Sequence, residues 1–79
     1  MTRADIFEKL NGIFSDVFDE PITVTEATTS ADIEDWDSLE HINLVAAVEQ
    51  ELGVKFTMGQ VVTMKNVGEM ADTILAKIS

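Results

Sequence analysis

The chain has 79 residues, with 15 acidic and 5 basic side chains and a formal net charge of −10. This length predicts one domain, residues 1–79, with a single core. The shortage of Lys and Arg argues against nucleic-acid binding, and partner proteins with basic patches are expected instead. Cysteine is absent, which excludes disulfides and thiolate metal sites. The first fourteen residues have neither signal-peptide nor membrane-span character, so we expect a cytoplasmic monomer without membrane insertion.

A helix is predicted over residues 3–18. Thr2 is a suitable N-cap, with Asp5 three residues later as in a capping box. Pro21 ends the segment, because proline disfavours helical geometry in the residue before it. The apolar residues recur at helical spacing and are flanked by phenylalanines: Ile6, Leu10, Ile13 and Val17, with Phe7, Phe14 and Phe18.

Residues 19–36 are predicted to form a long loop pinned by Ile22, Val24 and Ile33. Its length, about 18 residues, exceeds that of most connections in compact domains and is often associated with function. The clearest helical pattern follows over residues 38–52. Asp37 and Glu40 suit its first turn, and Gly53 supplies a C-terminal stop. Its apolar stripe comprises Leu44, Val45, Val48 and Leu52.

A short helix is predicted over residues 58–62, capped by Thr57. The final helix is predicted to start at Asn66 and to continue to Ile78, because residues 66–69 resemble a capping box. The predicted fold class is therefore all-α, a small four-helix bundle of three long helices and one short, with a long loop between helices one and two.

Ser38, at the start of the second helix, is the main candidate functional residue. A serine nucleophile needs an oriented base and an oxyanion hole in a sheltered pocket. The sole histidine, His41, is expected to be a surface residue, so we predict no catalytic residue and no enzymatic activity. The carboxylates of residues 32–37 lack EF-hand spacing, and no metal site is predicted. The helix N-terminus favours an anion esterified to Ser38, although an ordinary helix start explains the same residues.

Three segments together resemble the acyl carrier protein family. They are Trp36-Asp37-Ser38-Leu39-Glu40-His41-Ile42-Asn43-Leu44-Val45, then Val48-Glu49-Gln50-Glu51-Leu52-Gly53-Val54-Lys55-Phe56, and Asn66-Val67-Gly68-Glu69-Met70. The resemblance covers essentially the whole chain. It implies a four-helix bundle whose Asp-Ser-Leu serine receives 4′-phosphopantetheine from coenzyme A through a magnesium-dependent holo-synthase (phosphopantetheinyl transferase). The arm's thiol then holds acyl groups as thioesters, and Ser38 is the implied covalent attachment site.

The resemblance also implies a surface for the holo-synthase and for acyl-loading and acyl-transferring enzymes with basic patches. On this chain, the resemblance implies the acidic neighbour Asp37 and the apolar contact Leu39. The helix face outside the core stripe adds the apolar residues Ile42 and Ala46, with Glu40 and Glu49 as an acidic rim and Glu51 at its edge. An ordinary solvated helix face explains the same residues. Five further residues either line an acyl cavity or are ordinary core: Phe56, Val61, Val62, Met64 and Ile74.

Three features depart from the pattern of fatty-acid synthesis carriers. Asn43 stands at a commonly acidic position, residues 58–63 lack acidic side chains, and Trp36 replaces a small residue. We therefore expect a discrete carrier of a specialised lipid, polyketide or related pathway. Two alternatives remain open: an unmodified adaptor with the carrier fold that binds a basic partner, and a carrier of aminoacyl or hydroxyacyl cargo.

Overall fold

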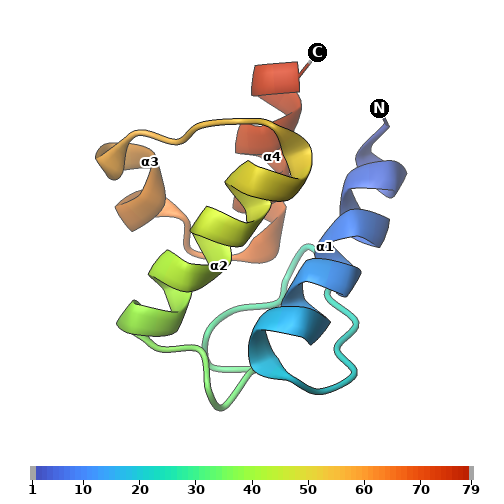
Figure 1. Ribbon diagram of the computed structural model, residues 1–79, viewed down its shortest axis with the longest axis vertical. Helices are drawn as coiled ribbons and strands as arrows, with labels where there is room; N and C mark the ends of the chain where they lie inside the picture. The colour runs from blue at the N-terminus through green and yellow to red at the C-terminus, as the bar shows by residue number, and fades with distance from the viewer. Residues whose placement is uncertain (1, 79) are drawn as a thin grey trace.

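The computed structural model describes residues 2–78, and this range contains four α-helices and no strand. The helices are α1 (Arg3–Phe18), α2 (Ser38–Leu52), α3 (Met58–Thr63) and α4 (Val67–Ile78). Helix α1 packs against both α2 and α4, and α3 lies on the far side of α2 from α1 (Figure 1). The predicted all-α four-helix fold is confirmed. Within residues 2–78, no helix has the length and apolar character needed to cross a bilayer.

The ends of α1 and α2 agree with the predicted boundaries. At the start of α1, the Asp5 N–H donates to the Thr2 hydroxyl at 3.2 Å, and the Thr2 N–H donates to the Asp5 carboxylate at 3.0 Å. This is the reciprocal capping box that the spacing predicted. Helix α2 ends at Gly53, which has φ +66° and donates its N–H to the Glu49 carbonyl. The positive φ explains why glycine suits this position.

The two later helices differ from the predicted boundaries by one residue each. Helix α3 extends to Thr63, whose hydroxyl donates back to the Gly59 carbonyl at 2.9 Å. Helix α4 begins at Val67 and not at Asn66. The Asn66 side chain accepts the Glu69 N–H at 2.8 Å, so Asn66 precedes the helix as a capping residue.

The core is built from one face of each long helix together with the loop between α1 and α2. Of the predicted stripe residues, Val17 and Leu52 are only half-buried, and both lie near the C-terminal end of their helix. The largest fully buried side chains are Phe14, Ile6, Leu10, Leu44, Met70, Ile74, Val48 and Val67.

Polar side chains of α1 hold the first part of the long loop. The Ile22 N–H donates to the Ser15 hydroxyl at 2.9 Å, and the Val24 N–H donates to the Asn11 amide oxygen at 2.7 Å. Val24 is buried and Ile22 is half-buried. The burial of Val24 and Ile33, with Ile22 packed against the core, confirms the predicted pinning of the loop by apolar residues. The two bonds to polar side chains of α1 add to it and were not predicted.

The same loop caps the N-terminus of α4. The N–H groups of Val67 and Gly68 donate to the carbonyls of Thr28 and Glu26, at 2.9 and 3.0 Å. These are two of the first-turn donors that a helix leaves without intrahelical partners. A Cβ at Gly68 would lie 2.8 Å from the Glu26 carbonyl oxygen, so the close approach requires glycine.

Arg3 joins α1, the loop and α4. Its guanidinium donates to the carboxylates of Glu26 and Asp72, each at 2.6 Å, and to the Gly68 carbonyl at 3.2 Å. The hydrogen bond to Glu26, followed by that to Asp72, raises the pKa of Arg3 above its ordinary value. The loop is therefore held by hydrogen bonds to both α1 and α4. These bonds fix the direction in which the chain enters α2.

Candidate functional site

Ser38 is the first residue of α2, and its side chain is exposed. Asp37 precedes it in an extended conformation, with φ −108° and ψ −173°, and accepts the Glu40 N–H at 2.8 Å. The Ser38 hydroxyl thus stands at the positive end of the helix dipole, beside first-turn N–H groups. A phosphodiester oxygen esterified at this position would be favourably placed.

A groove of about 520 Å³ opens beside Ser38, between the start of α2, the loop and α3. Most of its wall is apolar, with Lys65 as its basic side chain. The lining residues are Ser30, Trp36, Asp37, Ser38, His41, Ile42, Met58, Val61, Val62, Met64 and Lys65. The candidate serine is one of these lining residues, so a group attached to its hydroxyl would have the groove beside it.

The expected acyl-lining residues divide into two groups. Val61, Val62 and Met64 line the groove beside Ser38. Ile74 is fully buried and belongs to the core, whereas Phe56 is half-buried and packs against the core. The core interpretation therefore holds for Ile74, whereas an acyl-lining role of Val61, Val62 and Met64 stays a prediction.

The expectation that His41 is a surface residue is wrong. His41 is half-buried, and its ring stacks on that of Trp36 with 5.8 Å between centroids. The Trp36 indole Nε1–H donates to His41 Nδ1 at 3.1 Å, and His41 Nε2 lies 2.9 Å from the Val61 carbonyl oxygen. Both ring nitrogens are engaged, so the imidazole has no free lone pair with which to act as a base toward Ser38.

In the sequence, Trp36 stands out only as an unusual residue before Asp-Ser-Leu. In the structure it is 8% exposed and packs edge-on against Phe14, with ring centroids 5.2 Å apart. It also lies 6.4 Å from the Phe18 ring. The only sequence signal for the contact between Trp36 and His41 is their five-residue spacing. That spacing crosses the N-cap of α2, so helical periodicity cannot be used to interpret it.

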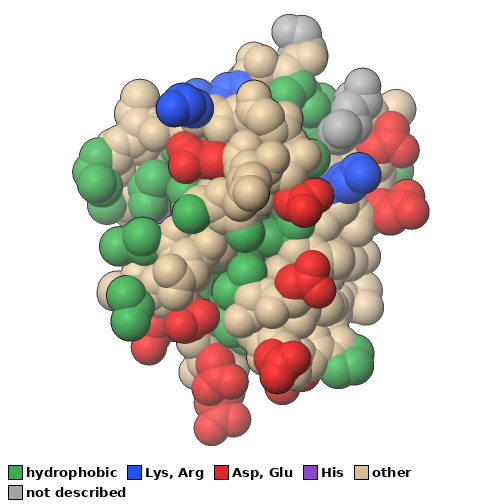
Figure 2. All heavy atoms as spheres, viewed as in Figure 1, with side chains coloured by type: hydrophobic (Ala, Val, Ile, Leu, Met, Phe, Trp, Pro, Cys, Tyr) green, Lys and Arg blue, Asp and Glu red, His purple; other side chains and the backbone are tan. Residues whose placement is uncertain are grey.

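The apolar surface around Ser38 has members on two helices. Leu39 and Ile42 of α2 are 67% and 59% exposed, as expected for residues outside the core. Met58 and Val62 of α3, which sequence reasoning missed as surface residues, are 75% and 71% exposed. Figure 2 shows hydrophobic side chains gathered over α3 and the neighbouring side of α2. Ala46 is also exposed on α2, as expected.

The expected acidic rim has unequal members. Asp37 is exposed, and Glu40 is half-buried with its carboxylate 3.4 Å from the Asn43 amide nitrogen. The Glu49 carboxylate accepts the Phe56 N–H at 2.8 Å and so fixes the segment that leads to α3. Glu49 therefore has a structural contact within the molecule, and its role toward partners stays a prediction.

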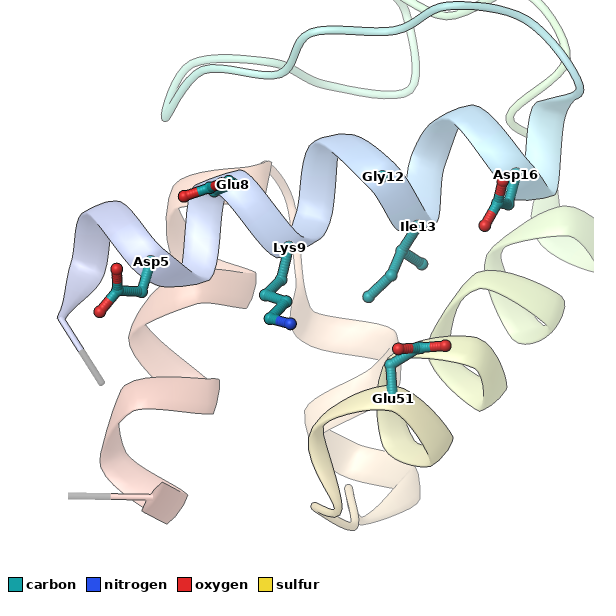
Figure 3. Close-up of a pocket in the computed structure, with 7 residues that line it drawn as sticks. All are labelled: Asp5, Glu8, Lys9, Gly12, Ile13, Asp16 and Glu51. Atoms are coloured by element: carbon teal, nitrogen blue, oxygen red, sulfur yellow. The ribbon is translucent and has the colours of Figure 1, made fainter.

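A second hollow, of about 590 Å³, lies away from Ser38 between α1 and the end of α2. Figure 3 shows Ile13 of α1 and Glu51 of α2 facing one another across it. Four of its seven lining residues carry carboxylates: Asp5, Glu8, Asp16 and Glu51. Over residues 2–78, no three His, Cys, Asp or Glu side chains are close enough together to hold a metal ion.

Comparison with known proteins agrees with this geometry. The family described as "Phosphopantetheine attachment site" matches residues 8–74. The chain belongs to the acyl carrier protein family. It is 31% identical over 81 residues to an acyl carrier protein of Thermosynechococcus vestitus, covering 100% of this chain and 99% of that protein. The solution structure of a holo acyl carrier protein from Geobacter metallireducens superposes with a TM-score of 0.85 and 40% identity, over 91% of this chain and 84% of that one.

Family membership confirms two of the predictions made from the sequence. The chain has the fold of an acyl carrier protein, and covalent phosphopantetheine is its prosthetic group. The residues around Ser38 fit such a group, because an exposed hydroxyl, a helix N-terminus and an adjoining groove occur together there.

Proposed function

We propose that Ser38 bears the 4′-phosphopantetheine and that the chain carries acyl groups between biosynthetic enzymes without catalysing a reaction itself. The observation that supports this most is the position of the exposed Ser38 hydroxyl at the first turn of α2, at the mouth of the groove. When bound, the arm supplies a thiol that holds acyl groups as thioesters, a group that this cysteine-free chain lacks.

The residues around Ser38 have separate tasks in this proposal. Asp37 holds the first turn of α2 through its bond to Glu40, which keeps the serine hydroxyl presented to a modifying enzyme. The positive end of α2 stabilises the negative charge of the phosphodiester. Lys65, which lines the same groove, adds a positive charge to this site.

We further propose that partner enzymes dock on an apolar surface formed by Leu39 and Ile42 of α2 and by Met58 and Val62 of α3. All four side chains are exposed by more than half. With a net charge of −10, the chain favours partners whose docking site is apolar at its centre and basic at its edge. The apolar surface of α3 supports a role in a specialised pathway and not in housekeeping fatty-acid synthesis. Enzymes that bind an acidic third helix would have no carboxylates to bind on residues 58–63.

Intact mass spectrometry tests the attachment site. Incubation with a broad-specificity holo-synthase, coenzyme A and magnesium should add roughly 340 Da, the mass of the arm. Ser38→Ala should abolish the shift. Ser30→Ala is the matched control, since Ser30 is also exposed beside the same groove and should leave the modification intact.

Two results would contradict the proposal: no added mass with several synthases, or an added mass that survives in Ser38→Ala. The mass of the chain purified from its native host separates a carrier from an unmodified adaptor, because an adaptor would show only the unmodified mass. The adduct found on the native arm would also identify the cargo as acyl, hydroxyacyl or aminoacyl.

A further inference from the structure

Helix α3 forms one wall of the groove beside Ser38, but it is weakly anchored by apolar packing. All six of its residues are described, and none is buried. Two of its three large apolar side chains, Met58 and Val62, are 75% and 71% exposed. The side-chain bond that reaches it from α2 is the one between His41 and the Val61 carbonyl, 2.9 Å long. This carbonyl belongs to the last turn of α3, where a helix leaves its acceptors without intrahelical donors.

The hydrogen bonds around His41 define one state of the imidazole. The indole Nε1–H of Trp36 can only donate, so His41 Nδ1 must be an unprotonated acceptor. The Val61 carbonyl can only accept, so His41 Nε2 must bear the proton. The chain of bonds from Trp36 through His41 to Val61 is therefore complete only when the imidazole is neutral and protonated at Nε2.

Protonation of His41 would place a second N–H on Nδ1, directed at the indole N–H only 3.1 Å away. Two donors would then face each other, and the 8% exposed indole has little access to water as a substitute acceptor. Relief requires the imidazole to move away from Trp36. Because the same ring holds Val61, such a movement would release α3.

The charged surroundings of His41 are simple. Asp37, at the start of α2, and Lys65, after α3, line the same groove and have opposite charges. Helix α3 itself contributes no ionisable side chain over residues 58–63. From α1, the aromatic residues Phe14 and Phe18 pack against Trp36. His41 is thus the titratable group that the hydrogen bonds place between Trp36 and the last turn of α3.

We propose that His41 is a positioning residue, which holds α3 beside Ser38 as the neutral Nε2-protonated imidazole and releases it on protonation. The wall of the groove that α3 forms would then be held in place at neutral pH and displaced in acid. The proposal concerns the polypeptide alone. Its test needs no prosthetic group, so its failure is distinguishable from failure of the proposed attachment at Ser38.

NMR spectroscopy of the ¹⁵N-labelled chain tests the proposal, and the single tryptophan and single histidine make their side-chain signals unambiguous. Near pH 8, the imidazole should show the Nε2–H tautomer. As the pH is lowered toward about 5, the indole N–H of Trp36 and the amides of residues 61–64 should shift together with the imidazole. Amides in the core of α1 and α4, such as those of Leu10 and Met70, should not follow. Protection factors of α3 amides should fall by roughly two- to tenfold, the equivalent of one lost hydrogen bond.

Two variants separate the hydrogen-bond mechanism from a general effect of acid. His41→Gln cannot titrate in this window, so its α3 amides should not respond to pH. Trp36→Phe removes the indole donor but leaves the bond from Nε2 to Val61 possible in both charge states. Its imidazole should therefore titrate without a response in α3.

Three results would overturn the proposal. The first is an Nδ1–H tautomer at neutral pH. The second is titration of His41 in the parent chain without any change in the α3 amides. The third is an α3 response to pH in His41→Gln or Trp36→Phe that equals the response of the parent.

Discussion

Leu44→Ala and Ile42→Ala remove similar apolar volume from two sites only two residues apart on α2. Leu44 is fully buried, whereas Ile42 is 59% exposed. One faces the core shared with α1, and the other faces the groove and the solvent. The pair therefore tests whether the orientation of α2 is correct, because any rotation of the helix would exchange the two effects.

The expected magnitudes follow from these exposures. Leu44→Ala should lower the free energy of unfolding by about 2–5 kcal/mol, through lost transfer energy and the cavity left behind. A loss of ~3 kcal/mol would lower the Tm of a chain of this size by roughly 12 to 24 °C. The variant would then retain only part of a total stability expected at about 4–12 kcal/mol. Ile42→Ala should cost under about 1 kcal/mol, since the side chain is mostly exposed and alanine favours the helix by a few tenths of a kcal/mol.

Thermal and urea unfolding followed by far-UV circular dichroism measures both values, and the rate of modification at Ser38 supplies a second readout. Ile42→Ala should slow modification about fivefold, the equivalent of about 1 kcal/mol at a docking contact, while leaving the fold intact. A cost below about 1 kcal/mol for Leu44→Ala, or equal costs for the two variants, would refute the assigned orientation of α2.

Three further outcomes are expected. The Tm should rise with added NaCl or magnesium, because a net charge of −10 on so small a chain is self-repulsive and salt screens it; an unchanged Tm would show repulsion to be negligible. Hydrogen bonds from Thr2, chiefly from its backbone N–H, lower the pKa of Asp5 below the ordinary 3.8. The stability that ionised Asp5 contributes is therefore present above pH 3.8 and is lost as the pH falls through the lowered pKa. The difference in Tm between Asp5→Asn and the parent should accordingly shrink in acid below pH 3.8, and a constant difference would argue against the capping box as its source. Gly68→Ala should destabilise the chain by about 1–3 kcal/mol in urea unfolding, because its Cβ would lie 2.8 Å from the Glu26 carbonyl oxygen. Gly12→Ala, with no neighbour within 4 Å, should instead stabilise α1 by about 0.4–1 kcal/mol. Equal effects of the two substitutions would show the contact at Gly68 to be unimportant.

The helices were predictable because their signals are local. Thr2 with Asp5 and Asp37 with Glu40 define helix starts within four residues, and Gly53 defines a stop through its own backbone conformation. Apolar spacing alone then identified the core side of α1 and α2. The same local reasoning predicted that Ser38 lies exposed at the first turn of α2, as the structure has it. It did not predict the groove beside the serine.

The features that were not predictable depend on contacts between elements. His41 was expected at the surface, because no local pattern indicates that its ring lies between Trp36 and the Val61 carbonyl. The Glu49 contact to Phe56 likewise depends on where the chain turns after α2. The loop was expected to be long and pinned by apolar side chains, but its capping of α4 required the position of a helix that begins about forty residues later.

The departures from the housekeeping pattern are related to one another through the structure. A small residue in place of Trp36 would leave Phe14 without its edge contact and His41 without its donor. Without that donor, His41 Nδ1 would be free and the state of the imidazole would no longer be defined. Helix α3 lacks buried residues, and the bond from His41 supplements its limited packing. Trp36, His41 and the apolar surface of α3 therefore belong to one arrangement around Ser38, in which a change at the first residue alters what the other two can do. A change at residue 36 would therefore alter the groove beside Ser38 without altering the Asp-Ser-Leu sequence that places the serine at the start of α2.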